Sequence, residues 1–338
     1  MDFSARMARI GRQIVRRSAM AVLALPLVLG AANSVHAQDD YPNRPVTIIL
    51  PFGTGGVSDI IARTLAPHLE ESLGQRFVVE NMPGAGGMVA TQAAYDGDNE
   101  GYTLMNAGHS ATIRATLMPN APLSQIDDFD PVAPVGEFGL VIVAKAGSDI
   151  ASVQDLVAMA KANPDRITVA TVAVGSTQHL AALLFNAVAG IDATVVPYKS
   201  SPEAMAAVAR GEADVAFEIT AGAKNAIDAG QVVPIATTLN RRSVAFPDLP
   251  SVEESGVKPY YVSSWNAYMA PKGIPKNVVN KLNTEIQRII QLPDVKAKLL
   301  EFGVEPYVGD ARTVSDRAAS DVERWRKVIT DAGLPIQQ

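Results

Sequence analysis

The chain has 338 residues, a formal net charge of −6 at pH 7 and no cysteine. An acidic chain lacks the lysine- and arginine-rich surface that nucleic acids and anionic membranes require, so neither is expected as a partner. The absence of cysteine excludes disulfides, thiol nucleophiles and cysteine-ligated metals. The histidines are far apart in sequence, so no metal site is predicted.

The first forty residues have the pattern of an export signal. Five arginines between residues 6 and 17 precede an apolar run at 19–32 that is too short to span a bilayer. Val35-His36-Ala37 is a small-x-small cleavage sequence. A membrane anchor is the alternative, but no other apolar stretch approaches ~18 residues. We therefore predict a cleaved signal peptide at 1–37 and a periplasmic mature protein.

From residue 46 the chain alternates apolar runs with amphipathic segments, which predicts an α/β fold with mostly parallel strands. The run VTIIL at 46–50 has no polar alternation, as expected for a strand covered by helices on both faces. Ile61, Leu65 and Leu69 then recur with a helical period. The strands of this first unit are predicted at 46–50, 78–80 and 102–105, with a second helix at 88–95.

A second unit repeats this order, with strands at 167–172, 194–198 and 214–217. Two copies of one order predict two similar lobes. Apolar segments near 136–145 and 262–270 are expected to cross between them and form a hinge, which creates a cleft. We predict lobe 1 from residues 38–138 plus 263–338 and lobe 2 from 139–262. The C-terminal helices are expected to pack back on lobe 1.

Four strand-to-helix turns are rich in glycine, serine and threonine, at 51–59, 81–87, 175–178 and 198–203. Such turns border the ligand site in open α/β sheets. Glycine allows close backbone approach, and helix N-termini favour anions. Ordinary turn chemistry explains any one of them, but four at matched positions favour an anion pocket. The last turn has two capping registers, Ser201 before Pro202 or Ser200 with Glu203.

Cofactor and enzyme patterns fail at the same turns. No Gly-Lys-Ser/Thr sequence follows Gly55-Gly56, and Ser58 stands where a dinucleotide-binding pattern needs its third glycine, so no cofactor is expected. No G-x-S-x-G elbow occurs. Asp59 could serve as the base of a cleft hydrolase or isomerase, although helix capping is its simpler role. His109 and His179 are equally consistent with cleft-lining and structural roles.

Four motifs in this order resemble the Bug family, the TctC-type periplasmic receptors of tripartite tricarboxylate transporters: PFGTGGVSD at 51–59, NMPGAGG at 81–87, PYK at 197–199 and SWN at 264–266. The resemblance covers essentially the whole mature chain. It implies a two-lobed periplasmic-binding-protein fold (Venus flytrap, type II-like) that closes on a small organic carboxylate. It also implies a protein without enzymatic activity that delivers its ligand to a membrane permease of the tripartite tricarboxylate type. We expect this protein to be a monomer.

In such receptors the first two turns hold a carboxylate and the second lobe supplies selectivity. The turns and the resemblance together give these candidate ligand-binding residues: Phe52, Gly53, Thr54, Gly55, Ser58, Asp59, Asn81, Gly84, Ala85, Gly86, His109, Ser110, Ser176, Thr177, Gln178, Tyr198, Lys199, Glu218 and Trp265.

The ligand itself stays open, because the family takes tricarboxylates, dicarboxylates, acidic and amidated amino acids, nicotinic acid and aromatic acids. This chain departs from the usual pattern at Thr54, where proline is common, and at Glu218, where aspartate is common. Aromatic residues near the turns make an aromatic dicarboxylate such as terephthalate attractive; these are Phe52, Tyr198, Phe217, Trp265 and Tyr268. A periplasmic sensor that presents its ligand-bound form to a signalling partner is the alternative function.

Overall fold

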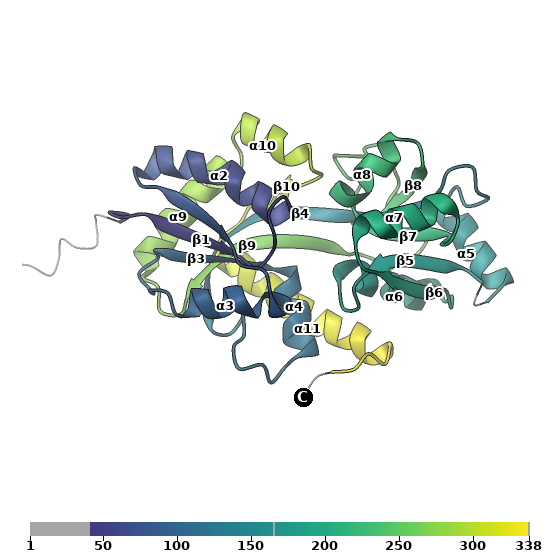
Figure 1. Cartoon of the computed structure of the whole chain (residues 1–338), viewed down its shortest axis with the longest axis horizontal. Helices are drawn as coiled ribbons and strands as arrows, with labels where there is room; N and C mark the ends of the chain where they lie inside the picture. Colours follow the sequence, from purple (N-terminus) through teal and green to yellow (C-terminus); the bar gives the residue numbers. More distant parts are fainter. Residues whose placement is uncertain (1–40, 165, 337–338) are drawn as a thin grey trace, which may run out of the picture. The chain divides into compact units, whose positions relative to one another are not determined.

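The structure is a computed structural model that describes residues 41–164 and 166–336 (Figure 1). The predicted signal peptide lies outside the described residues. None of the helices in these two ranges is long and apolar enough to cross a membrane.

The first lobe is built on three parallel strands, and a helix follows each of them. β1 lies between β2 and β3 and pairs with both. The strands and helices are β1 (Val46–Leu50), α2 (Val57–Leu73), β2 (Phe77–Asn81), α3 (Met88–Tyr95) after a 3-10 turn η1 (Ala85–Gly87), β3 (Thr103–Gly108) and α4 (His109–Leu117). The predicted strand and helix order is confirmed here.

The second lobe repeats that arrangement. β5 pairs in parallel with β6 and β7, as β1 does with β2 and β3. Its elements are α5 (Val153–Ala162), β5 (Thr168–Val172), α6 (Thr177–Ala189), β6 (Thr194–Tyr198), α7 (Ser201–Arg210), β7 (Val215–Ile219), α8 (Thr220–Asp228) and β8 (Val232–Thr237).

Two long antiparallel strands, β4 (Phe129–Lys145) and β9 (Ser263–Pro271), run side by side between the two sets of strands (Figure 1). The strand order is β2-β1-β3-β9-β4-β7-β5-β6. β4 pairs with β9 up to Gly139 and with β7 from Leu140 onward. A Cβ atom at Gly139 would lie 2.7 Å from the Leu239 side chain. β4 therefore changes its partner at a position where a side chain does not fit.

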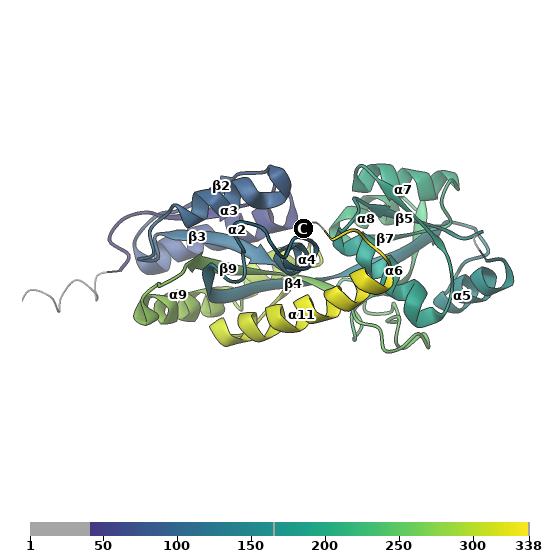
Figure 2. The ribbon, with the colours of Figure 1, turned by 90° about the horizontal axis from the view of Figure 1, so that it is seen from below.

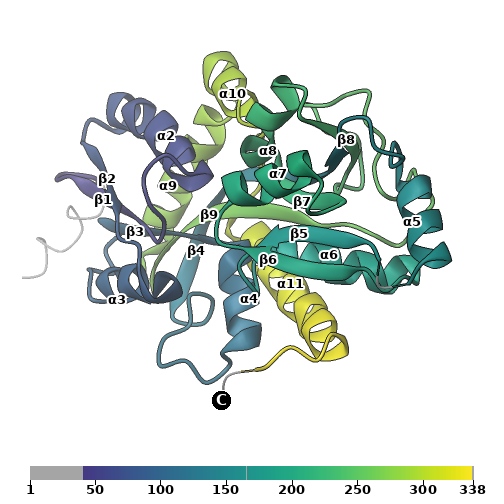
Figure 3. The same ribbon diagram turned by 45° about the vertical axis from the view of Figure 1, so that its right-hand side comes forward.

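Helices cover both faces of the second lobe's sheet (Figure 3). Leu140 and Ile142 of β4 pack in the core that includes α5 and α6, while the alternate residues Val141 and Val143 pack in the core with α7 and α8. Successive side chains of a strand point to opposite faces. This two-sided cover explains why the strand sequences show no polar alternation.

Three helices and a short strand complete the chain: α9 (Lys276–Ile289), α10 (Pro293–Leu300), β10 (Glu305–Pro306) and α11 (Ala311–Asp331). Val314 and Ala318 of α11 pack in the first lobe's core, as predicted. Its last turns instead place Trp325 and Ile329 in the second lobe's core with Phe185. α11 therefore packs on both lobes and not on the first alone, because its 21 residues reach from α4 to α6 (Figure 2).

Candidate functional site

A cavity of about 340 Å³ opens where the carboxyl ends of the strands of both lobes meet. Its lining residues come from four strand-to-helix turns and from the two crossing strands. They are Phe52, Gly56, Val57, Ser58, Ser110, Phe138, Ser176, Thr177, Gln178, Ile219, Ser264, Trp265 and Asn266.

Four helix N-termini converge on this cavity. α2, α4, α6 and α8 follow β1, β3, β5 and β7, which are the two inner strands of each lobe. A helix N-terminus stabilises a nearby anion by about 0.3–1 kcal/mol, and more when partly buried. Among the described residues, no lysine or arginine lines the cavity. Any negative charge bound here would therefore be held by N–H groups and hydroxyls.

On the first lobe's side, the start of α2 is open to a ligand. Gly56 is the N-cap residue and no side chain caps the helix. The buried Ser58 hydroxyl accepts hydrogen bonds from the side-chain amides of Asn266 (3.2 Å) and Asn106 (3.4 Å). Because two amides donate to this oxygen, its own hydrogen remains available to donate. The first turn of α2 thus offers N–H and O–H donors to an acceptor in the cavity.

Asp59 acts behind this turn and does not line the cavity. Its carboxylate accepts from the Gly55 N–H (2.9 Å), Arg63 Nε (2.9 Å) and Asn81 Nδ2 (3.0 Å). Burial alone would raise the pKa of Asp59, but these hydrogen bonds and the Arg63 charge outweigh it and lower the pKa. The residue therefore stays ionised and fixes the glycine turn. The exposed Gly53 and Thr54 also lie in the turn outside the cavity lining.

On the second lobe's side, the start of α6 is capped by the chain itself. Ser176 Oγ accepts from the His179 N–H at 3.1 Å. The next two residues, Thr177 and Gln178, line the cavity. Gln178 donates through Nε2 to Glu218, a fully buried carboxyl behind the cavity wall. At α6 the second lobe therefore presents side chains, whereas α8 begins after Ile219 without a side-chain cap.

The turns after the outer strands β2 and β6 do not line the cavity. Gly84, Ala85 and Gly86 are exposed in the first of these turns. In the second, Tyr198 is half-buried and Lys199 is exposed. β2 and β6 are the two end strands of the sheet, so the turns that follow them are separated from the crossing strands β4 and β9 by the inner strands of each lobe. A ligand-binding role for these residues stays a prediction.

The second outer turn also decides between the two capping registers. Ser200 is the N-cap of α7 and its hydroxyl accepts from the Glu203 N–H at 3.4 Å. The Glu203 carboxylate in return accepts from the Lys199 N–H at 3.2 Å. The Ser200 and Glu203 register is the one that forms.

His109 lies behind the cavity. Its buried ring packs edge-on against Trp325, with Nδ1 3.6 Å from the Asp321 carboxylate. Burial lowers the pKa of His109, although Asp321 acts in the opposite direction. Asp321 also accepts from Nε1 of Trp265 at 2.8 Å, so it joins α11 to the cavity wall. Of the predicted Gly108-His109-Ser110 group, Ser110 is the residue that reaches the cavity.

Sequence reasoning did not select six of the lining residues, namely Gly56, Val57, Phe138, Ile219, Ser264 and Asn266. Four of them lie inside motifs that were recognised at 51–59 and 264–266. Phe138 and Ile219 lie on strands in the middle of the sheet and carry no local signal. Of the predicted aromatic residues, Phe217 and Tyr268 are fully buried in the core.

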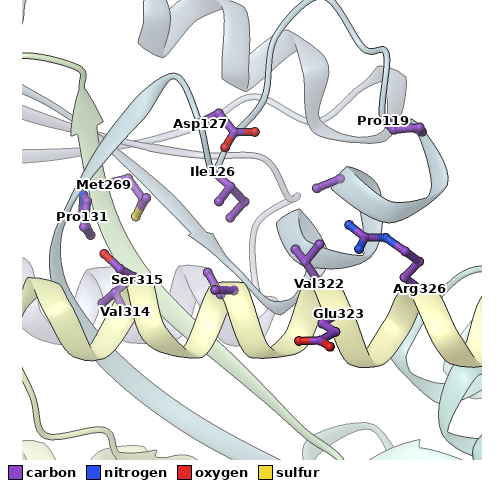
Figure 4. A pocket seen from close by; sticks show the side chains of 13 residues that line it. Pro119, Ile126, Asp127, Pro131, Met269, Val314, Ser315, Val322, Glu323 and Arg326 are labelled. Carbon is purple, nitrogen blue, oxygen red and sulfur yellow. The ribbon is translucent and has the colours of Figure 1, made fainter.

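A larger groove of about 540 Å³ runs along α11, and Figure 4 shows Ile126, Met269 and Val322 around it. No strand-to-helix turn of the kind described above borders this groove. Its lining is mostly apolar, and its charged members are Asp127, Glu323 and Arg326. The helix N-termini and hydroxyls gather at the smaller cavity, which is therefore the better candidate site.

The fold and the cavity are those of a two-lobed solute-binding protein. Residues 61–334 match the model of the tripartite tricarboxylate transporter family receptor, TctC. The protein BugT of Bordetella pertussis is 32% identical over 320 residues, which are 94% of this chain and 98% of BugT.

Two solved structures are similar over nearly their full lengths. A structure from R. palustris with adipate is 30% identical with a TM-score of 0.74, covering 87% of this chain and 98% of that one. MatC from Rhodopseudomonas palustris, with bound malate, is 27% identical with a TM-score of 0.71, covering 86% of this chain and 100% of MatC.

The chain belongs to the TctC family of tripartite tricarboxylate transporter receptors. The resemblance seen in the sequence is thereby confirmed. Members of this family are periplasmic binding proteins and not enzymes, so the cleft hydrolase or isomerase is set aside.

Proposed function

We propose that this protein captures a small organic carboxylate in the cavity between its two lobes and delivers it to a permease of the tripartite tricarboxylate type. The observation that carries the proposal is the convergence of four helix N-termini on a cavity without a lining cation. Such a site suits an anion held by backbone N–H groups. The adipate and malate bound by the two similar structures support the same ligand class.

In the proposed mechanism the carboxylate docks first on the first lobe, at the uncapped start of α2. Closure about the crossing strands then brings Ser176 and Thr177 onto the ligand. We propose lobe 1 as 38–138 plus 263–338 and lobe 2 as 139–262; the change of partner along β4 at Gly139 supports this division. We propose that the protein is exported to the periplasm, that residues 1–37 are cleaved off, and that the mature protein is a monomer.

The cavity wall favours a ligand with an apolar body. Phe52, Phe138 and Trp265 contribute aromatic surface, and the cavity volume lies in the range of small-molecule sites. Aromatic acids, terephthalate included, therefore belong in the first ligand panel beside aliphatic dicarboxylates. Helix ends alone contribute too little for micromolar affinity, which needs about 8 kcal/mol, so burial of this apolar body must contribute.

A thermal-shift screen of residues 38–338 against small carboxylates tests the proposal. A ligand present at a hundred times its Kd should stabilise the protein by about 2.7 kcal/mol and raise its melting temperature. X-ray scattering should then show ligand-dependent compaction. If no carboxylate stabilises the protein, and the denatured protein releases no bound carboxylate, the proposal is wrong. Pull-down from a membrane extract distinguishes a permease from a signalling partner.

A further inference from the structure

The second lobe contains a buried carboxyl that no cation neutralises. Glu218 lies on β7 with 0% of its surface exposed. No Lys, Arg or His in the described part of the chain forms an ion pair with it. Burial raises its pKa, while hydrogen bonds from Gln178 and from the Ile219 N–H act in the opposite direction. Its other oxygen, Oε2, is buried and has no hydrogen-bond partner among the described residues. A buried carboxyl without a counter-ion lowers the stability of the folded state, which suggests that Glu218 is present for its function.

One oxygen of this carboxyl has a fixed role. Glu218 Oε1 accepts from the Ile219 N–H at 2.8 Å and from Gln178 Nε2 at 2.9 Å. In the ionised carboxylate Oε1 can only accept, and the structure gives it two donors, the Ile219 N–H and Gln178 Nε2. The side chain that faces it must therefore present a donor, and for Gln178 this means the NH₂ end of its amide.

This contact fixes the direction of the Gln178 amide. Asparagine and glutamine amides carry an acceptor and two donors, and their orientation follows from the hydrogen-bond network. With Nε2 committed to Glu218, the carbonyl Oε1 is the free end of the amide. No donor within residues 41–164 and 166–336 pairs with this oxygen. The oxygen is also not fully buried. Since Gln178 lines the cavity, its carbonyl is available to a ligand there.

We propose that Glu218 is a positioning residue that turns the Gln178 carbonyl toward the ligand and thereby selects a hydrogen-bond donor at the ligand's far end. The inference rests on the proposed function, with the first carboxylate held by the first lobe. A second carboxylate at the far end would face the Gln178 carbonyl, which cannot donate to it, with the acidic Glu218 behind. A carboxamide at the same position would donate to Gln178. The preferred ligand class is thus a monocarboxylate with a donor such as an amide opposite the acid.

Matched ligand pairs test this inference by calorimetry at pH 7.5, where the carboxylic acids are ionised. The pairs are adipate with its monoamide and terephthalate with its monoamide. We expect the wild-type protein to bind each monoamide about tenfold more tightly or better, since a mismatched charged group loses a hydrogen bond and leaves partners unpaired. Wild-type binding of the dicarboxylates with equal or higher affinity would overturn the inference.

Two substitutions of Glu218 separate positioning from mere packing. E218Q keeps a carbonyl oxygen that can accept from both Ile219 N–H and Gln178 Nε2, so the preference should persist. E218M has a similar length but no such acceptor, so the Gln178 amide can turn over and the preference should shrink to within about threefold. Equal preferences in E218Q and E218M would contradict the assigned role.

Q178M supplies the same test if E218M fails to fold, because it removes the amide and leaves Glu218 in place. It should bind the acid and the amide of each pair with similar affinity, and a retained preference would refute the inference. If wild-type protein binds carboxylates without preferring the monoamide, only this inference fails. If it binds neither member of any pair nor any other carboxylate, the proposed function fails with it.

Discussion

The two lobes share one order of strands and helices, but the two matched helices α2 and α6 begin differently at the cavity. In the first lobe, α2 and α4 start after Gly56 and Gly108 without a side-chain cap. In the second lobe, α6 is capped by Ser176, and Thr177 and Gln178 reach the cavity instead. Of these two matched turns, the one in the first lobe therefore leaves backbone donors free, and the one in the second lobe presents specific side chains. We propose that the first lobe binds the carboxylate and that the second lobe discriminates among ligands.

Crowding at the start of α4 offers the strongest way to disrupt this arrangement. A Cβ atom on Gly108 would lie 2.0 Å from the Trp265 carbonyl oxygen and 3.1 Å from the Asn266 Cα. G108A must therefore push α4 away from β9, and we expect it to abolish ligand binding and to cost about 1–3 kcal/mol or more. Thermal denaturation and calorimetry measure both effects.

Gly53 provides the matched control: although the sequence predicted a ligand contact there, it is exposed outside the cavity lining, and a Cβ there meets nothing within 4 Å. G53A should change the stability by less than about 0.5 kcal/mol and preserve binding. If G108A and G53A behaved alike, the close approach of α4 to β9 would not matter for the site.

The next largest effect on stability is expected from Asp59, which holds the glycine turn at 51–59 in place. In D59N an NH₂ group can face the Gly55 N–H, which loses its acceptor, and the Arg63 ion pair is lost as well. We expect a loss of about 1–3 kcal/mol in the free energy of unfolding and weaker binding of every carboxylate. Chemical denaturation gives the first quantity. A D59N protein as stable as the wild type would remove Asp59 from its structural role.

Hydroxyl deletions compare the lobes directly. S58A removes a first-lobe donor, and we expect a loss of about 1 kcal/mol, or roughly fivefold in Kd, for all carboxylates alike. T177V removes a second-lobe hydroxyl at constant volume and should change the ratios of affinities among ligands. Calorimetry with adipate, malate and an aromatic acid measures both patterns. Identical patterns for S58A and T177V would argue against a division of labour between the lobes.

The smallest expected effect is a pH dependence that originates behind the cavity. Burial lowers the pKa of His109, which faces Asp321 together with Arg317 and Arg324. Because the unfolded chain takes up a proton near pH 6.5 before the buried ring does, the free energy of unfolding should fall as the pH drops below that value. H109Q should reduce this slope. Denaturation at pH 7.5, 6.5 and 5.5 checks it, and an unchanged slope would exclude His109 as its source.

The sequence by itself determined the order of the elements and the family. The apolar run without polar alternation at 46–50 predicted a strand covered on both faces, because burial demands that composition, and the run at 167–172 predicted a strand of the second unit. Glycine and serine turns at 51–59 and 175–178 marked two helix starts that now border the cavity. These features are local, since they follow from the period of a strand or helix and from the chemistry of one turn.

Only the tertiary structure decided which turns reach the cavity. The turns at 81–87 and 198–203 have the same local chemistry as the other two, yet they follow the outermost strands and lie away from the crossing strands. Phe138 and Ile219 enter the site because β4 leaves β9 and pairs with β7 and β8 at this level. Strand order and partner exchange depend on contacts between segments far apart in the chain. The residue types and spacing along one segment do not predict such contacts.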